Sequence, residues 1–252
     1  MPEKQNFTDQ TRLAASQLKE LSKSIFSSLY PNYDRVVMYF TFFHDRKWKA
    51  YLLNRAKLKR GSMVLDIGIG TGILEDIVAA KSSPEFVGID MSADMLKECM
   101  KKKISKVSDL IQADAEHLPF RNSSFGAVLS CYVVKYCRAS EFVSQAFAVL
   151  KPGGILAFYD FARPMRRISL HYVYVCFILP LLGRISARTV KWISPTMKEL
   201  PKVIMNSEWE ATIRLFLRSS GFDTTVNELL SSKGARLVVA KKEAAMQQPH
   251  RF

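Results

Sequence analysis

The stretch VLDIGIGTG, Val64 to Gly72, constrains the fold more than any other part of the chain. An apolar run and one carboxylate lead directly into glycines at three alternate positions, Gly68, Gly70 and Gly72. A glycine-rich turn between a buried strand and a helix lets backbone N–H groups approach a ligand closely. The stretch therefore predicts a nucleotide-binding turn after the first strand of a parallel sheet.

Short apolar runs alternate with helical patterns on both sides of this turn, which is typical of a parallel sheet built from βαβ units. Thr71 and Ser92 are suited to cap two of the helices. We expect strands at residues 62–68, 85–91, 108–114, 125–134 and 155–161, and a closing pair at 222–230 and 235–242. The expected helices cover residues 71–81, 92–103, 139–150 and 208–220.

The chain divides into five segments on this interpretation. They are a helical N-terminal extension or lid (1–60), a nucleotide-binding core (61–161), an apolar and basic cap insert (162–206), the completion of the core (207–242) and a disordered tail (243–252). The most apolar stretch, residues 168–183, lies in the insert and is shorter than the roughly 20 residues that a membrane-spanning helix needs. It is either a buried cap helix or a lid that forms an apolar pocket and touches a membrane.

The net charge of +14 is unevenly distributed. Residues 1–60 sum to +7, residues 61–160 to −2 and residues 161–252 to +9. Two basic arms around a slightly acidic middle suit nucleic acid, an anionic membrane or simple solubility. The N-terminus has no apolar leader, and the spacing of the four cysteines suggests neither a zinc site nor a disulfide framework. We therefore expect a cytoplasmic protein without a metal, with possible peripheral contact to a membrane.

The details of the turn favour one cofactor over another. A dinucleotide fingerprint needs glycine or alanine where this chain has Ile73. The carboxylate of Asp66, beside the turn, is unsuited to a pyrophosphate but suits a ligand that carries an ammonium group. S-adenosylmethionine has an α-amino group and a sulfonium, and the chain has no phosphate-binding G-x-x-x-x-G-K-[ST] sequence. The pattern therefore favours S-adenosylmethionine over NAD.

Acidic residues also end the next two expected strands. Asp90, followed by Met91, stands where a carboxylate can accept hydrogen bonds from both ribose hydroxyls. Asp114 and Ala115 end the third strand, where a carboxylate and a backbone amide can recognise the amine and a ring nitrogen of adenine. Three acidic strand ends around one glycine turn are unlike scattered surface carboxylates, so we predict a cofactor site there.

The motifs VLDIGIGTG, GIDMSADML, QADAEHLPF and VLKPGG resemble those of class I S-adenosylmethionine-dependent methyltransferases. That resemblance implies a Rossmann-like α/β fold with a seven-stranded, mostly parallel sheet whose last strand is antiparallel. A narrower resemblance, to the ubiquinone/menaquinone biosynthesis C-methyltransferases, rests on YDRVVMYFTFFHDRKWK, DFARP and ILPLLG. It implies cofactor contacts at Thr71, Asp90, Asp114, Ala115 and Cys131, and a Tyr33 that closes over the cofactor.

The chain departs from the narrower family where that family faces its substrate. Val37 replaces an asparagine, and VVKY replaces Gly-Leu-Arg-Asn, so that Lys135 and Tyr136 stand for arginine and asparagine. Methylation of a phenolic ring needs a general base or a cation that stabilises the phenolate. Lys135 is a candidate for the cation, and Asp160, His44 and His171 are candidates for the base, although each can equally be structural.

Three hypotheses for the function follow. The first is a methyltransferase of a small apolar or aromatic acceptor, such as a demethylated menaquinone or ubiquinone ring. The second is an RNA methyltransferase whose basic arms contact phosphates, although the chain has no recognisable RNA-binding module. The third is a non-catalytic protein that binds S-adenosylmethionine. The sequence does not specify the oligomeric state.

Overall fold

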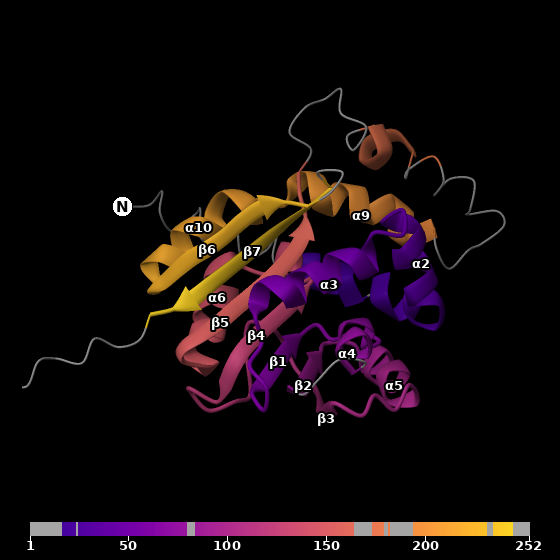
Figure 1. Cartoon of the computed structure of the whole chain (residues 1–252). Helices are drawn as coiled ribbons and strands as arrows, with labels where there is room; N and C mark the ends of the chain where they lie inside the picture. The colour runs from indigo at the N-terminus through magenta and orange to yellow at the C-terminus, as the bar shows by residue number, and fades with distance from the viewer. Residues whose placement is uncertain are drawn as a thin grey trace, which may run out of the picture.

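The computed structural model describes residues 17–23, 25–79, 84–163, 173–178, 181, 194–230 and 234–243. Its centre is a seven-stranded sheet with the order β3-β2-β1-β4-β5-β7-β6 (Figure 1). The strands are β1 (Met63–Ile67), β2 (Glu85–Asp90), β3 (Val107–Gln112), β4 (Phe125–Cys131), β5 (Leu150–Phe161), β6 (Phe222–Leu229) and β7 (Ala235–Lys242). Strands β1 to β5 pair in parallel, and β7 is antiparallel to both of its neighbours. The predicted sheet is confirmed.

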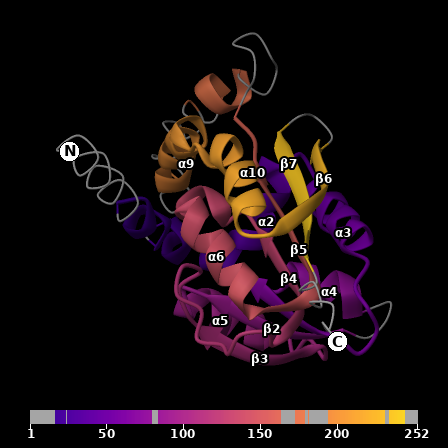
Figure 2. The ribbon, with the colours of Figure 1, turned by 90° about the vertical axis from the view of Figure 1, so that its left-hand side faces the viewer.

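Helices cover both faces of the sheet. They are α2 (Tyr33–Phe40), α3 (Asp45–Ala56), α4 (Ile73–Ala79), α5 (Ala93–Lys101), α6 (Ala139–Val149), α9 (Ser194–Asn206) and α10 (Trp209–Ser219). Short 3-10 helices are η1 (Tyr30–Asn32) and η2 (Val134–Tyr136), and η3 (Tyr174–Ile178) is a π-helix. Figure 2 shows α6 and α10 on one face of the sheet and α3 on the other.

Successive residues of the central strands supply two separate cores. Leu65 and Ile67 of β1 pack with residues of α6 and α10, whereas Val64 packs with residues of α3 and α4. A parallel strand buried on both faces is apolar at every position rather than at alternate positions. At the start of α5, the hydroxyl of Ser92 accepts a hydrogen bond from the backbone N–H of Met95, as expected of a helix cap.

Two strand boundaries differ from the sequence prediction by three residues or more. Strand β5 begins at Leu150 rather than at residue 155, because the expected break at Gly153 is accommodated within the strand by a left-handed backbone (φ 73°). The pairing of β4 with β5 shifts register between Phe125 and Ala127, as an irregularity of this kind requires. Strand β4 ends at Cys131 rather than at residue 134, because the chain turns there into η2.

A third apolar cluster lies outside the two faces of the sheet. Ile25 and Leu29, from the helical residues 25–29, pack with Val36 and Phe40 of α2 and with Leu200 of α9. The N-terminal segment and part of the insert after β5 are thereby held together, next to the carboxyl ends of the parallel strands (Figure 1). Within the described ranges, no helix is long and apolar enough to cross a membrane.

Candidate functional site

The glycine turn after β1 has the geometry that its sequence predicted. Gly68, Gly70 and Gly72 all have a positive φ, of 78°, 57° and 77°. A Cβ on Gly68 would lie 2.2 Å from Cγ2 of Val133, and one on Gly72 would lie 2.8 Å from Sγ of Cys99. Both the backbone conformation and the close packing therefore require glycine at Gly68 and Gly72, whereas the backbone conformation alone favours it at Gly70.

Asp90, at the end of β2, fixes this turn. Its Oδ2 accepts a hydrogen bond from the backbone N–H of Gly70 (2.9 Å), and its Oδ1 accepts one from that of Ser92 (2.8 Å). Burial raises the pKa of Asp90 to about 6, although these backbone donors oppose the shift. Its carboxylate is therefore held rigidly at the edge of the sheet and retains acceptor capacity for a ligand.

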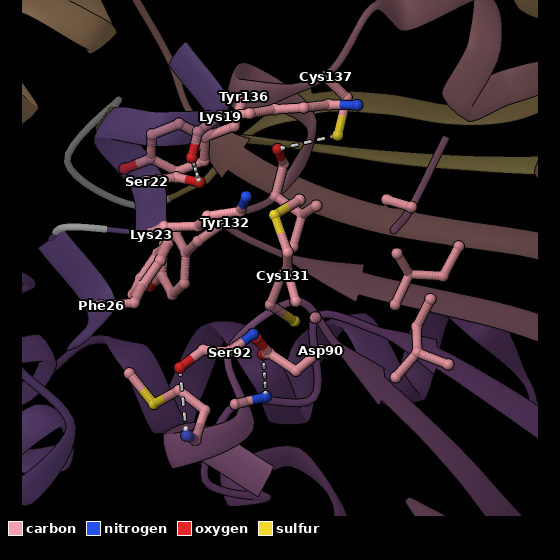
Figure 3. A pocket seen from close by; sticks show the side chains of 18 of the residues that line it. Lys19, Ser22, Lys23, Phe26, Asp90, Ser92, Cys131, Tyr132, Tyr136 and Cys137 are labelled. Carbon is pink, nitrogen blue, oxygen red and sulfur yellow. Dashed lines mark hydrogen bonds between the residues drawn. The ribbon is translucent and has the colours of Figure 1, made fainter. Parts of the chain in front are cut away.

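A cavity with about 730 Å³ of empty space lies above this edge. In Figure 3, Lys23 and Phe26 of the N-terminal segment lie on one side of the cavity, Asp90 and Ser92 lie on the other, and Cys131 lies between them. The predicted cofactor contacts that line it are Tyr33, Gly68, Gly70, Asp90, Met91, Ala115 and Cys131. We call this space the main cavity.

Asp66 and Thr71 line a smaller neighbouring cavity of about 300 Å³ rather than the main one. The hydroxyl of Thr71 donates a hydrogen bond to Oδ1 of Asp34 in α2 (2.5 Å). Lys102 donates to the other oxygen of the same carboxylate (2.7 Å). The hydroxyl of Thr71, which we expected to cap the following helix, thus joins the glycine turn to the N-terminal segment.

Asp66 and Glu75 form a buried carboxyl pair behind the glycine turn, with exposed fractions of 2% and 0%. Burial raises the pKa of Asp66 to about 6 and that of Glu75 well above its usual range, and the two side chains interact with each other. Within the described structure, Oδ1 of Asp66 and both Oε atoms of Glu75 have no hydrogen-bond donor from another residue. Asp66 lines the smaller cavity, and an unsatisfied buried acceptor there suits a cationic ligand group, so Asp66 fits a cofactor that carries an ammonium and a sulfonium.

Asp114 does not line the main cavity; it binds a lysine of the N-terminal segment instead. Lys19 donates hydrogen bonds to Asp114 (2.8 Å) and to Glu116 (2.5 Å). Burial opposes ionisation of Asp114, but the backbone N–H of Glu116 and the ammonium of Lys19 outweigh it and lower the pKa. Arg138 also binds Glu116 (3.2 Å), so the cluster fastens residues 17–23 over the expected adenine end of the cavity.

A second cavity, with about 420 Å³ of empty space, adjoins the main one. The two share four aromatic residues in their walls: Phe26, Tyr33, Tyr132 and Tyr136. Helix α2 contributes Val36, Val37 and Phe40, and α9 contributes Thr196 and Leu200. Lys135 is the charged residue in this otherwise mostly apolar lining. We call this space the apolar cavity.

Lys135 and Asp160 are both buried and form an ion pair (Nζ to Oδ1, 2.9 Å). Burial lowers the pKa of Lys135 and raises that of Asp160, and their mutual attraction opposes both shifts. Asp160 also accepts hydrogen bonds from the backbone N–H groups of Lys135 (3.0 Å) and Phe161 (2.7 Å). Asp160 therefore holds Lys135 in place and does not itself line a described cavity.

The ammonium of Lys135 is surrounded by aromatic rings. It lies 4.4 Å from the ring centroid of Tyr136, 5.5 Å from that of Phe161 and 5.6 Å from that of Tyr132. It donates hydrogen bonds to Asp160 and to the backbone oxygen of Tyr132. Since an ammonium has three donors, one N–H remains, within the described structure, for an oxygen in the apolar cavity.

Tyr132 is a site residue that the sequence analysis missed. It lines all three cavities and has a left-handed backbone (φ 64°), which is uncommon for an aromatic residue. Its hydroxyl donates to Oδ1 of Asp45 (2.9 Å), which also binds the ammonium of Lys49 (2.5 Å). Both members of that pair are buried in α3, so α3 fixes the ring of Tyr132 between the cavities. An i,i+4 spacing of Asp45 and Lys49 suggests only a surface pair, so no local pattern predicts this contact.

Of the two histidine candidates for the general base, the structure describes only His44. His44 is half-exposed, and its Nδ1 lies 2.8 Å from the backbone oxygen of Phe42 and 3.1 Å from that of Thr41. It lines neither the main nor the apolar cavity. His171 lies outside the described residues. A catalytic role for Lys135, Asp160 or His44 stays a prediction.

The fold and the site together define a class I S-adenosylmethionine-dependent methyltransferase. Comparison with known families specifies it further: the model of the ubiE/COQ5 methyltransferase family matches residues 14–232, and the chain belongs to that family. The predicted enzyme class, family and cofactor are thereby confirmed. The hypotheses of an RNA methyltransferase and of a non-catalytic protein are not favoured.

The chain is similar to curated proteins of several bacteria. It is 26% identical over 194 residues to the ubiquinone/menaquinone biosynthesis C-methyltransferase of Geotalea daltonii, covering 72% of this chain and 82% of that protein. It is 31% identical over 172 residues to the protein of the same name from Desulfotalea psychrophila (66% and 69% covered). The demethylmenaquinone methyltransferase of Listeria welshimeri is 27% identical over 194 residues (73% and 82% covered).

Solved structures share the fold at lower identity. A putative methyltransferase of Haloferax volcanii, in complex with the Trm112 activator, aligns with a TM-score of 0.63 at 16% identity, covering 86% of this chain and 97% of that one. A SAM-dependent methyltransferase of Aquifex aeolicus aligns with a TM-score of 0.51 at 17% identity (90% and 98% covered).

Proposed function

We propose that this enzyme methylates a ring carbon of a quinone-type acceptor in its reduced, hydroquinone form. The observation that carries the proposal is the wall of four aromatic residues shared by the main cavity and the apolar cavity. A methyl donor in the main cavity and a flat apolar ring in the apolar cavity would face each other across this aromatic wall. The names of the curated relatives, which are C-methyltransferases of ubiquinone and menaquinone biosynthesis, support carbon as the acceptor atom.

S-adenosylmethionine, when bound, supplies a methyl group that is already activated by its sulfonium. Asp90 would accept hydrogen bonds from the ribose hydroxyls, and the backbone of Ala115 would lie at the adenine. Asp66, in the wall of the smaller cavity, would attract the ammonium group. Tyr33, in the walls of both cavities, would separate the cofactor from solvent on the side of α2. These residues bind and orient; the methyl group needs no further activation.

Lys135 would act on the acceptor. Its unused N–H can donate to a ring oxygen that has lost its proton to solvent as the acceptor enters, and its positive charge stabilises this phenolate, which makes the ring carbon nucleophilic. The carbon–sulfur bond of the donor breaks as the carbon–carbon bond forms, and the proton of the methylated ring carbon then returns to the ring oxygen or to solvent, which restores the hydroquinone. The apolar walls keep water from the reacting carbon and strengthen that electrostatic effect. Asp160 and the three surrounding rings keep the ammonium in one position, which reduces the reorganisation needed during the reaction.

His44 stays a candidate for the general base, and it would have to reach the acceptor from outside the two cavities. We also propose that the enzyme works at the cytoplasmic face of an anionic membrane, where a lipid quinone resides. The apolar lining of the acceptor space and the basic flanks of the chain support this placement.

The test is methyl transfer from labelled S-adenosylmethionine to a short-tailed, water-soluble demethylated hydroquinone, with RNA as a parallel acceptor. We expect label in the hydroquinone. The Lys135→Met variant should lose transfer by about a hundredfold or more, as removal of one electrostatic contact to a developing oxyanion does elsewhere. Its affinity for S-adenosylmethionine should stay unchanged.

Lys151→Met is the matched control, because Lys151 is exposed and lies at the end of β5 opposite to Asp160, the partner of Lys135. It should retain full transfer. Label in RNA alone, or equal transfer by Lys135→Met and Lys151→Met, would contradict the proposal.

A further inference from the structure

Seven large apolar side chains are exposed in two segments that flank the site. At the end of α2 and in the turn after it, Tyr39, Phe42 and Phe43 are exposed by 61%, 59% and 61%. In and beside η3, the exposed residues are Val173, Phe177, Ile178 and Leu181, with Phe177 at 61%. We call these seven residues the apolar patch. Isolated exposed apolar residues are ordinary, but several of them together indicate an interaction surface.

The two segments are in contact, so the patch is continuous. The rings of Phe42 and Tyr174 lie 4.8 Å apart between centroids. The hydroxyl of Tyr174 donates a hydrogen bond to the backbone oxygen of Phe40 (3.2 Å). On the α2 side, the rings of Tyr39 and Phe43 also contact each other, with centroids 5.6 Å apart.

The backbone holds two of the rings outward. Phe42 and Phe43 have φ values of 48° and 63°, which bulky residues rarely adopt. Hydrogen bonds fix the turn: the N–H of Phe43 donates to the backbone oxygen of Met38 (2.7 Å), and that of His44 donates to the oxygen of Thr41 (2.9 Å). His44 thus has a structural place in the turn that presents these rings.

The patch lies on the reverse side of the wall of the apolar cavity. Val36, Val37 and Phe40 of α2 line that cavity, whereas Tyr39 of the same helix is exposed in the patch. One helix therefore separates the proposed acceptor space from the exposed aromatic rings. An acceptor bound in the apolar cavity would therefore lie one helix away from the patch.

The positive charge beside the patch favours an anionic partner. Arg35 and Lys47, next to the α2 residues of the patch, are exposed, and the exposed Arg46 pairs with Asp76 (3.4 Å). The neighbouring acid Asp34 is paired with Lys102 (2.7 Å). In the sequence, residues 163–206, which contain the η3 part of the patch, include eight basic residues and one acidic residue. Aromatic and aliphatic side chains bordered by lysine and arginine fit the interface of an anionic lipid bilayer.

We infer that the apolar patch docks this enzyme onto the surface of an anionic phospholipid bilayer. Phe42, Phe43 and Phe177 enter the boundary between headgroups and acyl chains, and the surrounding basic residues lie against lipid phosphates. The docked enzyme then receives a lipid acceptor at the α2 wall without transfer through water. This last step rests on the proposed function, whereas docking itself does not.

The first experiment is co-sedimentation of the full chain with vesicles of phosphatidylcholine, with and without phosphatidylglycerol. We expect binding to the anionic vesicles that weakens with salt. Loss of each ring should reduce partitioning by about tenfold, so Phe42→Ser/Phe43→Ser should reduce it by about a hundredfold. Leu215→Ser is the matched control, because Leu215 is 67% exposed but lies on α10; it should bind like the unmodified chain.

Affinity for S-adenosylmethionine, measured by calorimetry on each variant, shows that the variants are folded. Absence of binding to anionic vesicles, equal binding to both vesicle types, or equal loss with Leu215→Ser would overturn the inference. Sedimentation that shows a dimer of the unmodified chain, and a monomer of Phe42→Ser/Phe43→Ser, would assign the patch to a second copy instead.

Transfer to two acceptors separates this inference from the proposed function. Phe42→Ser/Phe43→Ser should methylate the short-tailed hydroquinone normally but lose transfer to a long-tailed hydroquinone embedded in anionic vesicles. Vesicle binding without transfer to either acceptor would contradict the proposed function and leave the docking surface standing.

Discussion

Replacing either member of the buried Lys135–Asp160 pair tests the electrostatics of the site most quantitatively. With Nζ and Oδ1 at 2.9 Å, the attraction between the two charges is about 6 kcal/mol at an effective dielectric constant of about 20. Desolvation of both groups offsets much of this gain, so the pair adds little net stability. Removal of one partner, however, leaves an uncompensated buried charge and costs about 3–5 kcal/mol.

The two single variants should differ in a predictable order. Lys135→Met leaves Asp160 with two backbone N–H donors and should cost about 3 kcal/mol. Asp160→Leu leaves the ammonium and both of those N–H groups without their acceptor and should cost about 5 kcal/mol. The double variant should cost about 3 kcal/mol rather than about 8 kcal/mol, because no isolated charge remains and only the two backbone N–H groups lack an acceptor.

Equilibrium unfolding in urea, followed by tryptophan fluorescence at neutral pH, measures these free energies. A second observable is the pH dependence of Lys135→Met. Without Lys135, the pKa of Asp160 in the folded state is raised by burial above its unfolded value, so the folded state binds the additional proton. Stability of this variant should therefore increase as the pH falls from 7 toward the unfolded pKa of about 4. Additive costs in the double variant, or no recovery at low pH, would refute the reasoning.

Two further predictions concern the main cavity. Asp90→Asn should weaken binding of S-adenosylmethionine, measured by calorimetry, by about tenfold or more. The affinity of the unmodified chain should fall as the pH drops below about 6, where Asp90 becomes protonated. Binding that does not change between pH 5 and 7 would contradict the role of Asp90. Gly68→Ala should destabilise the fold by about 3 kcal/mol, because its Cβ would lie 2.2 Å from Val133. Gly61→Ala is the control for the backbone strain of Gly68→Ala, since Gly61 has φ 69° but an added Cβ would have nothing within 4 Å. An equal loss of stability in both variants would show that the close packing at Gly68 is irrelevant.

Much of the fold followed from local pattern. The strands of the core, the cap at Ser92 and the turn at Gly68 depend on apolar runs and on residue types with a strong local preference. The start of β5 was misplaced because glycine permits a break but does not require one, and sheet pairing across the irregularity decided the outcome.

The site was less predictable, because its key contacts join distant segments. Lys135 and Asp160 were named as separate candidates, yet they form one ion pair through the adjacency of β4 and β5. Asp114 was expected at the adenine, and only the tertiary structure brings Lys19 to it from 95 residues away. Tyr132 carries no motif; its position depends on Asp45 in α3.

The central claim is that the two cavities with a common aromatic wall bring a methyl donor to a ring carbon. The most direct measurement is NMR spectroscopy of the product formed from isotope-labelled methyl S-adenosylmethionine and the short-tailed hydroquinone. The account predicts that the label resides on a ring carbon. A label on a ring oxygen, or an unmodified hydroquinone in the presence of an enzyme that binds S-adenosylmethionine, would contradict it.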